Sequence, residues 1–247
     1  MSGSTSKCLT ALYQFWKNYF HELNFVSFDV TSRCNLHCQH CYFREQGHQE
    51  ELPEKEFKEL VQRVRRQYPG IYHASWVGGE PLLRAHLVEW GSRLFPFNMV
   101  VTNGTIPLPK WPNVLFHVSL DGPPSIHNAI RGPTYAQIKR HILQGLADGI
   151  PIGIACVINK KNTPYLGEFI EEWQGSGIRS MAFDFYTPIA GRPSELIVEL
   201  DERIPIIKLL RKIGKQYPGL ISGAQSWIVN MLPANVPRYV GDRKSVV

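Results

Sequence analysis

Apolar positions along the chain follow two patterns, short continuous runs and longer segments in which apolar side chains recur at helical spacing. The short runs are rich in β-branched and aromatic residues and span 25–30, 71–77, 97–102, 113–120, 151–158 and 178–186. Such a composition favours strands, and a nearly continuous apolar character is typical of a parallel sheet that is covered on both faces. The pattern therefore predicts six buried parallel strands.

Helix-like segments lie between these runs and after the last one. The first begins near Pro53, carries acidic residues early and arginines late, and ends at Pro69-Gly70, as the helix dipole and helix stop signals favour. The others span 83–94, 138–146 (behind a predicted cap at Thr134), 166–173 and 201–217. Strands that alternate with helices imply right-handed crossovers, and six units are too few for a closed eight-stranded barrel. We therefore expect an α/β fold, an open partial (β/α)6 barrel with parallel strands.

The length of 247 residues suits one domain with small extensions. We expect the barrel to span 22–217. Residues 1–21 would form an N-terminal extension, which we expect to be helical because leucine and aromatic side chains recur at helical spacing there. Residues 218–247 would form a C-terminal tail or the start of a truncated extension.

Three cysteines stand close together after the first predicted strand. Cys34, Cys38 and Cys41 have the spacing C-x3-C-x2-C and precede the helix that begins near Pro53, so they lie on a strand-to-helix loop. Such loops, at the carboxyl ends of strands, are where α/β folds bind ligands. Structural zinc sites and closed iron–sulfur sites normally take four protein ligands. Three thiolates favour a four-iron cluster with one iron open to a small molecule, which is a site for catalysis.

Two other uses of these cysteines have to be weighed. His37 or His40 could complete a zinc site, because short Cys/His tracts bind metal, although zinc modules usually bring a second Cys/His pair. The remaining cysteines, Cys8 and Cys156, are far apart in sequence. A disulfide framework fits poorly with five cysteines and no signal peptide. The iron–sulfur cluster is favoured, and the alternative is a non-catalytic zinc or iron–sulfur binding module.

Composition and charge exclude little. No apolar run approaches the roughly 20 residues needed to cross a bilayer, and the N-terminus lacks a signal core, so we expect a cytoplasmic protein. The net charge of +6 would allow an anionic partner, but the basic residues are scattered, with short clusters at 63–66 and 238–244. Clusters of this size are more typical of a solvated face than of a nucleic-acid surface.

Polar motifs also follow the later predicted strands. They comprise Gly78, Gly79 and Glu80 after the second strand, Asn103 after the third, Ser119 and Asp121 after the fourth, and Arg131 further on. Paired glycines let a backbone approach a ligand, a carboxylate can pair with an ammonium group, and an arginine fork can bind both oxygens of a carboxylate. Each motif alone is more typical of a turn, so only their recurrence at successive strand ends indicates a site.

Together these motifs resemble the radical S-adenosylmethionine (radical SAM) superfamily over roughly residues 22–190. The run Ser-Leu-Asp-Gly-Pro-x3-His-Asn-x2-Arg-Gly from 119 to 132 resembles the branch of sulfatase-maturating and peptide-modifying (SPASM-type) enzymes. The family signature is C-x3-C-x-Φ-C, with Φ usually Tyr, Phe or Trp, whereas here Φ is His40. Many members of that branch carry further cluster cysteines in a C-terminal extension, and this chain has no cysteine after Cys156.

The resemblance implies the cofactors and the reaction. Cys34, Cys38 and Cys41 would ligate a 4Fe-4S cluster, whose open iron binds the amino acid portion of S-adenosyl-L-methionine (SAM). The Gly-Gly-Glu motif, through Glu80, would hold the SAM amino group. An external flavodoxin-like or ferredoxin-like donor would supply one electron, and reductive cleavage of SAM would yield a 5′-deoxyadenosyl radical. By analogy with the branch, that radical would act on a peptide or protein substrate.

The same resemblance assigns the remaining polar residues. Ser119 and Arg131 would hold the SAM carboxylate, and Asp121 would shape the turn or touch the ribose. Asn103 would make a further polar contact at the rim of the barrel.

Asp184 lies in an otherwise apolar predicted strand, where it either faces the barrel interior as a substrate-binding or proton-handling group or caps a polar network.

Overall fold

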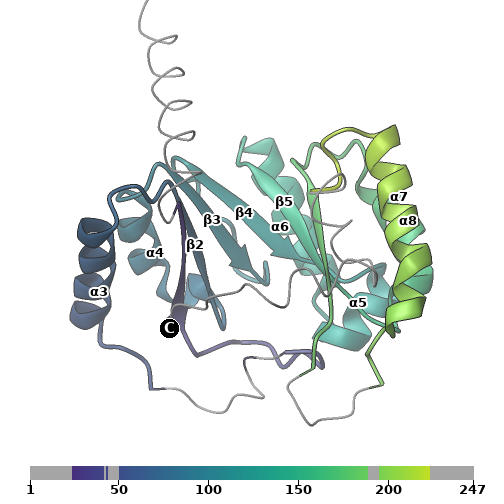
Figure 1. The fold of residues 1–247 in the computed structure, drawn as a ribbon, viewed down its shortest axis with the longest axis horizontal. Helices are drawn as coiled ribbons and strands as arrows, with labels where there is room; N and C mark the ends of the chain where they lie inside the picture. Colours follow the sequence, from purple (N-terminus) through teal and green to yellow (C-terminus); the bar gives the residue numbers. More distant parts are fainter. Residues whose placement is uncertain (1–23, 42, 44–49, 189–194, 223–247) are drawn as a thin grey trace, which may run out of the picture. The chain divides into compact units, whose positions relative to one another are not determined.

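The computed structural model describes residues 24–41, 43, 50–188 and 195–222 of the chain (Figure 1). Within them, six strands occur where the hydrophobic pattern predicts them: β1 (Phe25–Thr31), β2 (His73–Gly78), β3 (Phe97–Thr102), β4 (Val114–Ser119), β5 (Ile152–Ile158) and β6 (Met181–Phe185). The expected N-terminal helix, Cys8 and residues 223–247 lie outside the described residues.

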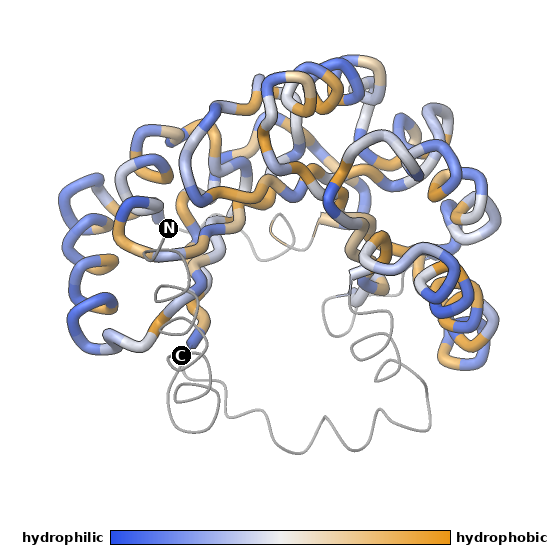
Figure 2. The backbone as a smooth tube through the Cα atoms, turned by 90° about the horizontal axis from the view of Figure 1, so that it is seen from above, coloured by the Kyte–Doolittle hydropathy of each residue, from blue (hydrophilic) through white to orange (hydrophobic). Residues whose placement is uncertain are grey.

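The strands form one sheet in the order of the sequence, β1-β2-β3-β4-β5-β6. β1 pairs with β2, β2 with β3, and β5 with β6, in parallel. Sequential parallel strands, joined by helical segments except between β3 and β4, confirm the predicted α/β class and the open barrel order. The strands are largely hydrophobic along their length, whereas hydrophobic and hydrophilic segments alternate along the helices (Figure 2).

Eight helical segments connect or follow the strands in the described part of the chain: α3 (Glu54–Gln67), η1 (Pro81–Arg84), α4 (Ala85–Ser92), α5 (Pro124–Arg131), α6 (Tyr135–Ala147), η2 (Thr163–Tyr165), α7 (Leu166–Trp173) and α8 (Leu200–Gln216). α3 has Glu54 and Glu56 in its first turn and buries Phe57 and Val61, as its sequence predicts. The short η1 and η2 are 3-10 turns that begin with or contain a proline and lead into α4 and α7.

Two local features differ from the sequence prediction. α5, which has eight residues and buries His127 and Ile130, was not predicted, because its segment was interpreted only as part of the polar motif that ends at Arg131 and Gly132. Thr134 precedes α6 as expected, but its side chain makes no capping hydrogen bond. Instead Asn128 Oδ1 accepts hydrogen bonds from the backbone N–H groups of Thr134 (3.1 Å) and Tyr135 (3.0 Å), which leaves the Thr134 hydroxyl beside His127.

The chain divides into two compact units. Of the described residues, the first comprises 24–35, 50–102 and 111–116, and the second comprises 36–41, 43, 103–110, 117–188 and 195–222. The cysteine loop therefore contributes Cys34 to the first unit and both Cys38 and Cys41 to the second.

The core of the first unit is built around Trp76. Its ring is fully buried and stacks on Phe28 with ring centroids 5.1 Å apart. The indole N–H donates to Asn98 Oδ1 at 3.0 Å, and the Asn98 amide in turn donates to the carbonyls of Ser92 and Phe95. The polar tip of the indole is thereby satisfied inside an apolar core, as buried polar groups require.

In the second unit, the first residues of the predicted C-terminal tail pair with the sheet. Ile221 forms a parallel bridge with Met181 of β6. The Met181 N–H donates to the Leu220 carbonyl (2.6 Å), and the Ser222 N–H donates to the Met181 carbonyl (2.8 Å). The chain after α8 thus returns to the start of β6.

Among the described residues, no helix combines the length and apolar character that crossing a bilayer requires.

A matched pair of helix glycines tests the packing of the first unit. A Cβ at Gly91 of α4 would lie 2.2 Å from Cη2 of Trp76, whereas a Cβ at Gly167 of α7 would meet no atom within 4 Å. Gly91→Ala should lower the free energy of unfolding by about 1–3 kcal/mol through overpacking, and Gly167→Ala should leave it equal or raise it by up to about 1 kcal/mol. Urea unfolding monitored by fluorescence measures both, and equal effects would contradict the packing described.

Candidate active site

The start of the cysteine loop is held by the Gly-Gly-Glu motif of the neighbouring strand. The Gly79 N–H donates to the Thr31 carbonyl (2.7 Å), and the Glu80 N–H donates to the Arg33 carbonyl (2.8 Å). Cys34 follows directly. Two motifs that are 45 residues apart in sequence are therefore joined by backbone hydrogen bonds, at the carboxyl ends of the parallel strands β1 and β2.

This close approach is why the two glycines are needed. A Cβ at Gly79 would lie 2.1 Å from the Arg33 carbonyl oxygen, and one at Gly78 would lie 2.5 Å from that of Thr31. Gly78 also has φ of +120°, which side chains rarely tolerate. The two glycines, called here the glycine cradle, thus permit a backbone contact with which any side chain would clash.

Glu80 lies at the end of this cradle with its side chain fully buried. Its Oε1 accepts hydrogen bonds from the Leu82 N–H (3.0 Å), which caps η1, and from Thr102 Oγ1 (2.8 Å) at the end of β3. A carboxylate held by a backbone amide and a hydroxyl in a buried site is fixed in position. Water competes weakly there for a cationic ligand.

Arg84, a residue that sequence reasoning missed, binds both ends of the cysteine loop. Its buried guanidinium donates to the Val30 carbonyl (3.0 Å) before the loop and to the Leu52 carbonyl (3.2 Å) after it. Glu51 adds ion pairs with Arg84 (3.5 Å) and Arg33 (3.1 Å). The only sequence signal was a charged side chain within the predicted helical segment 83–94.

The second unit contains a buried ion pair between Asp121 and Arg131. Arg131 Nε donates to Asp121 Oδ2 at 2.5 Å, and the other carboxylate oxygen accepts the Val157 N–H at 2.9 Å. Arg131 Nη1 lies 3.9 Å from Cys38 Sγ, and Nη2 lies 3.3 Å from His40 Nε2. Burial opposes the charge on Asp121, but Arg131 and the hydrogen bonds hold the pKa of that carboxyl below its ordinary value.

His40, the unusual residue of the cysteine motif, is buried against this pair. Its Nε2 lies 3.4 Å from Asp121 Oδ2, and its ring meets Tyr186 edge-on. Burial lowers the pKa of His40 to about 4, with Asp121 opposing and Arg131 adding to the shift. The ring is therefore neutral at pH 7. Because Nε2 accepts from Arg131, the proton resides on Nδ1, which is buried and has no hydrogen-bond partner.

Backbone contacts hold the rest of this loop segment against α5. The Gln39 N–H donates to the Ile130 carbonyl (2.9 Å), and the Cys41 N–H donates to the Cys38 carbonyl (3.3 Å). Lys161, beyond β5, donates to Gln39 Oε1 at 2.7 Å. The loop therefore makes a tight turn between two of its cysteines.

The other predicted polar residues lie at the expected strand ends. Asn103 is buried after β3, where its Oδ1 accepts from the N–H and hydroxyl of Thr105. Ser119 is the buried last residue of β4. Asp184 of β6 is exposed and pairs in register with Val157, the residue whose N–H Asp121 accepts.

The described cysteines are thiols, which is the donor chemistry that an iron–sulfur cluster takes. Among the described residues, no three Cys, His, Asp or Glu side chains converge closely enough to hold a metal ion. The joint ligation of a cluster by Cys34, Cys38 and Cys41 therefore stays a prediction. The donor chemistry of the thiols fits an iron–sulfur cluster, and the buried Glu80 carboxylate fits a cationic ligand.

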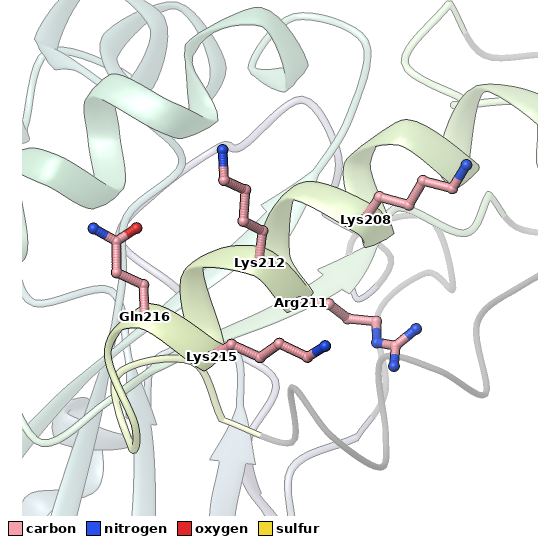
Figure 3. A pocket seen from close by; sticks show the side chains of 5 residues that line it. All are labelled: Lys208, Arg211, Lys212, Lys215 and Gln216. Carbon is pink, nitrogen blue, oxygen red and sulfur yellow. The ribbon is translucent and has the colours of Figure 1, made fainter.

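A separate hollow lies on α8. Cationic side chains of one helix surround it together with an amide: Lys208, Arg211, Lys212, Lys215 and Gln216 (Figure 3). None of the residues predicted to bind the cluster or the cofactor lines it. Its chemistry suits an anion.

Known proteins resemble this chain in sequence and in fold. Residues 28–172, more than half of the chain, match the Radical SAM superfamily. An uncharacterized protein of Methanocaldococcus jannaschii is 29% identical over 217 residues, which cover 79% of this chain and 73% of that protein. Fe-coproporphyrin III synthase of Methanosarcina barkeri is 28% identical over 188 residues, which cover 70% of this chain and 46% of that protein.

A solved structure of anSMEcpe with bound AdoMet and the Kp18Cys peptide has a TM-score of 0.67 at 19% identity, over 80% of this chain and 62% of that chain. At this identity the likeness shows the fold alone. The chain spans less than two thirds of the length of both the synthase and anSMEcpe.

The buried His127 predicts a pH dependence of stability. Its Nδ1 accepts the Asp121 N–H (3.4 Å), its Nε2 pairs with Thr134 Oγ1 (3.1 Å), and burial lowers its pKa to about 4, with Arg131 adding to the shift. A histidine pKa below the unfolded value of 6.5 means that stability is complete above pH 6.5 and falls toward pH 4. His127 should therefore cost the wild type about 2 kcal/mol of unfolding free energy between pH 7 and pH 5.

Denaturant unfolding at the two pH values measures this loss. His127→Asn should lose about 2 kcal/mol less than the wild type over the same interval. Equal pH dependence in the two proteins would contradict a buried neutral His127.

Proposed function

Because the chain belongs to the radical SAM superfamily, we propose that it is an enzyme that reductively cleaves SAM at an open 4Fe-4S cluster. The cofactors of this family are that cluster and SAM. We assign the cluster ligands to Cys34, Cys38 and Cys41, and the SAM contacts to the polar residues at the ends of β2, β3 and β4. When bound, the cluster and SAM together supply a 5′-deoxyadenosyl radical, which acts on the substrate.

One observation carries this proposal: backbone hydrogen bonds join the Gly-Gly-Glu motif to the residues that lead into Cys34. Gly79 and Glu80 donate to Thr31 and Arg33, which supports the proposal by joining the predicted SAM-binding motif to the segment that leads into Cys34, a predicted cluster ligand. A SAM amino group bound beside Glu80 would then keep a fixed position relative to Cys34. Two motifs that served only as turns would not need this close approach.

The residues of the chain contribute binding, orientation and exclusion of water. Glu80 supplies a buried carboxylate for the SAM ammonium group, and its bond from Thr102 fixes the direction in which the carboxylate points. Gly78 and Gly79 let the backbone that leads into Cys34 pack directly against the Gly-Gly-Glu motif, which holds Glu80 beside that segment. Such preorganisation is the protein's share of a reaction whose difficult step belongs to the cofactors.

We propose a peptide or protein as the substrate. The fold likeness to anSMEcpe, which binds a peptide, and the Ser-Leu-Asp-Gly-Pro run support this class. Asp184 is exposed on β6, level in register with the residue that Asp121 binds, and it would contact a substrate that enters there. A tetrapyrrole substrate, as the name of the synthase suggests, is the competing class.

The electron for each turnover would come from an external flavodoxin-like or ferredoxin-like donor. The cations Lys208, Arg211, Lys212 and Lys215 on α8 offer a surface that would attract an anionic partner (Figure 3). Charge complementarity of this kind speeds encounter more than it tightens binding.

Anaerobic reconstitution with iron and sulfide tests the cluster. The wild type should become brown, hold about four irons per chain and form 5′-deoxyadenosine from SAM only when a reductant is added. Ala substitution of any one of Cys34, Cys38 or Cys41 should abolish both, whereas Cys156→Ala should not. A colourless protein that binds one zinc and leaves SAM intact would support the non-catalytic module instead.

A second experiment tests Glu80. Glu80→Gln keeps an oxygen acceptor for Leu82 and Thr102 but removes the charge, so the fold and cluster content should persist. The dissociation constant of SAM should rise by about tenfold or more, which is the loss of one charged hydrogen bond. Isothermal titration with the reconstituted protein measures it.

Thr102→Val is the matched control, because it removes the hydroxyl that holds Glu80 but keeps the carboxylate charge. It should weaken SAM binding less than Glu80→Gln does. A Glu80→Gln protein that loses its cluster while binding SAM as before would show that Glu80 serves the fold and not the cofactor.

A further inference from the structure

The guanidinium of Arg131 is occupied by three groups of its own unit. Nε donates to Asp121 Oδ2 (2.5 Å), Nη2 meets His40 Nε2 (3.3 Å), and Nη1 points at Cys38 Sγ (3.9 Å). The resemblance assigned this arginine to the SAM carboxylate. The structure places it against a predicted cluster ligand.

The position of Arg131 is rigidly determined. Asp121 is bound from β5 through the Val157 N–H, so the carboxylate that receives Nε cannot turn freely. His40 blocks a second direction, because its ring is buried and accepts from Nη2. A planar fork held at two of its nitrogens has a fixed third nitrogen, and here that nitrogen is directed at sulfur.

A cation and hydrogen-bond donor beside a ligating thiolate changes the electrostatics of the metal centre. The reduced cluster carries one more negative charge than the oxidised cluster, so a nearby positive charge stabilises the reduced form. Hydrogen bonds to cluster sulfurs act in the same direction and help to set iron–sulfur potentials. Arg131 and Cys38 are both partly buried, so water screens the charge less than it would at an open surface.

We propose that Arg131 raises the reduction potential of the cluster by donating a hydrogen bond to the Cys38 thiolate, with Asp121 and His40 holding it in place. This inference rests on the proposed function, since it needs a cluster on Cys38. It adds a role that acts before SAM binds. Arg131 would then serve electron uptake from the donor, in addition to any contact with the SAM carboxylate.

An EPR-monitored redox titration of the reconstituted protein without SAM tests this. Arg131→Gln should lower the equilibrium constant for one-electron reduction at least tenfold, a fall of 59 mV or more in midpoint potential. Arg131→Lys retains a cation at a shorter reach and should recover part of the fall. Arg140→Gln removes an exposed arginine of α6 in the same unit and should leave the midpoint unchanged.

A second variant guards against misfolding, because Arg131→Gln leaves a buried carboxylate unpaired. The double variant Asp121→Asn with Arg131→Gln removes the pair as a neutral unit and should still lower the constant at least threefold. Circular dichroism and iron content verify that each protein is folded and loaded.

The outcomes separate this inference from the proposed function. A loaded cluster whose midpoint is the same in Arg131→Gln, in the double variant and in the wild type overturns the inference alone. If SAM binding is then weakened, Arg131 serves only the SAM carboxylate. A wild-type protein that assembles no 4Fe-4S cluster overturns the proposed function, and this inference with it.

Discussion

The buried ion pair between Asp121 and Arg131 is the contact on which the cysteine loop of the second unit depends. It joins the end of β4 to the end of α5 and, through Val157, to β5, and it places one nitrogen beside Cys38. Removing one partner of such a buried pair typically costs about 3–5 kcal/mol. Because breaking the pair costs this much free energy, Asp121 and Arg131 stay in place. His40 and the turn from Cys38 to Cys41 therefore pack against fixed side chains.

In the first unit, the start of the cysteine loop is held mainly by hydrogen bonds to the backbone. Parallel strands end at one edge of a sheet, so the loop after β1 and the turn after β2 meet there. Two glycines let them approach closely enough to exchange hydrogen bonds, and Arg84 closes the loop from behind by binding the carbonyls of Val30 and Leu52. Each part of the cysteine loop is therefore held by a different kind of interaction in its own unit.

The sequence was sufficient to predict the six strands and their order, because continuous apolar runs and helical periodicity are local signals. It failed for α5, a helix of eight residues whose segment was interpreted only as a polar motif. It also failed for the cap of α6, where Asn128 lies six residues away and only the folded turn brings it to Thr134.

Candidate residues for the site could be proposed from the sequence, but the contacts that they make could not. Glu80, Asp121 and Arg131 could be selected from their motifs. The bond of Glu80 to Thr102 spans 22 residues, and that of Arg131 to Cys38 spans 93, so neither leaves a local trace. Arg84 and Glu51 escaped notice for the same reason, because their partners are backbone carbonyls and charges brought near only by folding.

The pairing of residues 220–222 with Met181 has a consequence for how the protein avoids misassembly. A strand at the border of a sheet presents unpaired N–H and C=O groups, on which another chain can add and begin to aggregate. At the start of β6, the N–H and carbonyl of Met181 are already engaged by Leu220 and Ser222. The chain thus protects this border with its own backbone, and a deletion that removed these few residues would expose a template for intermolecular strand addition.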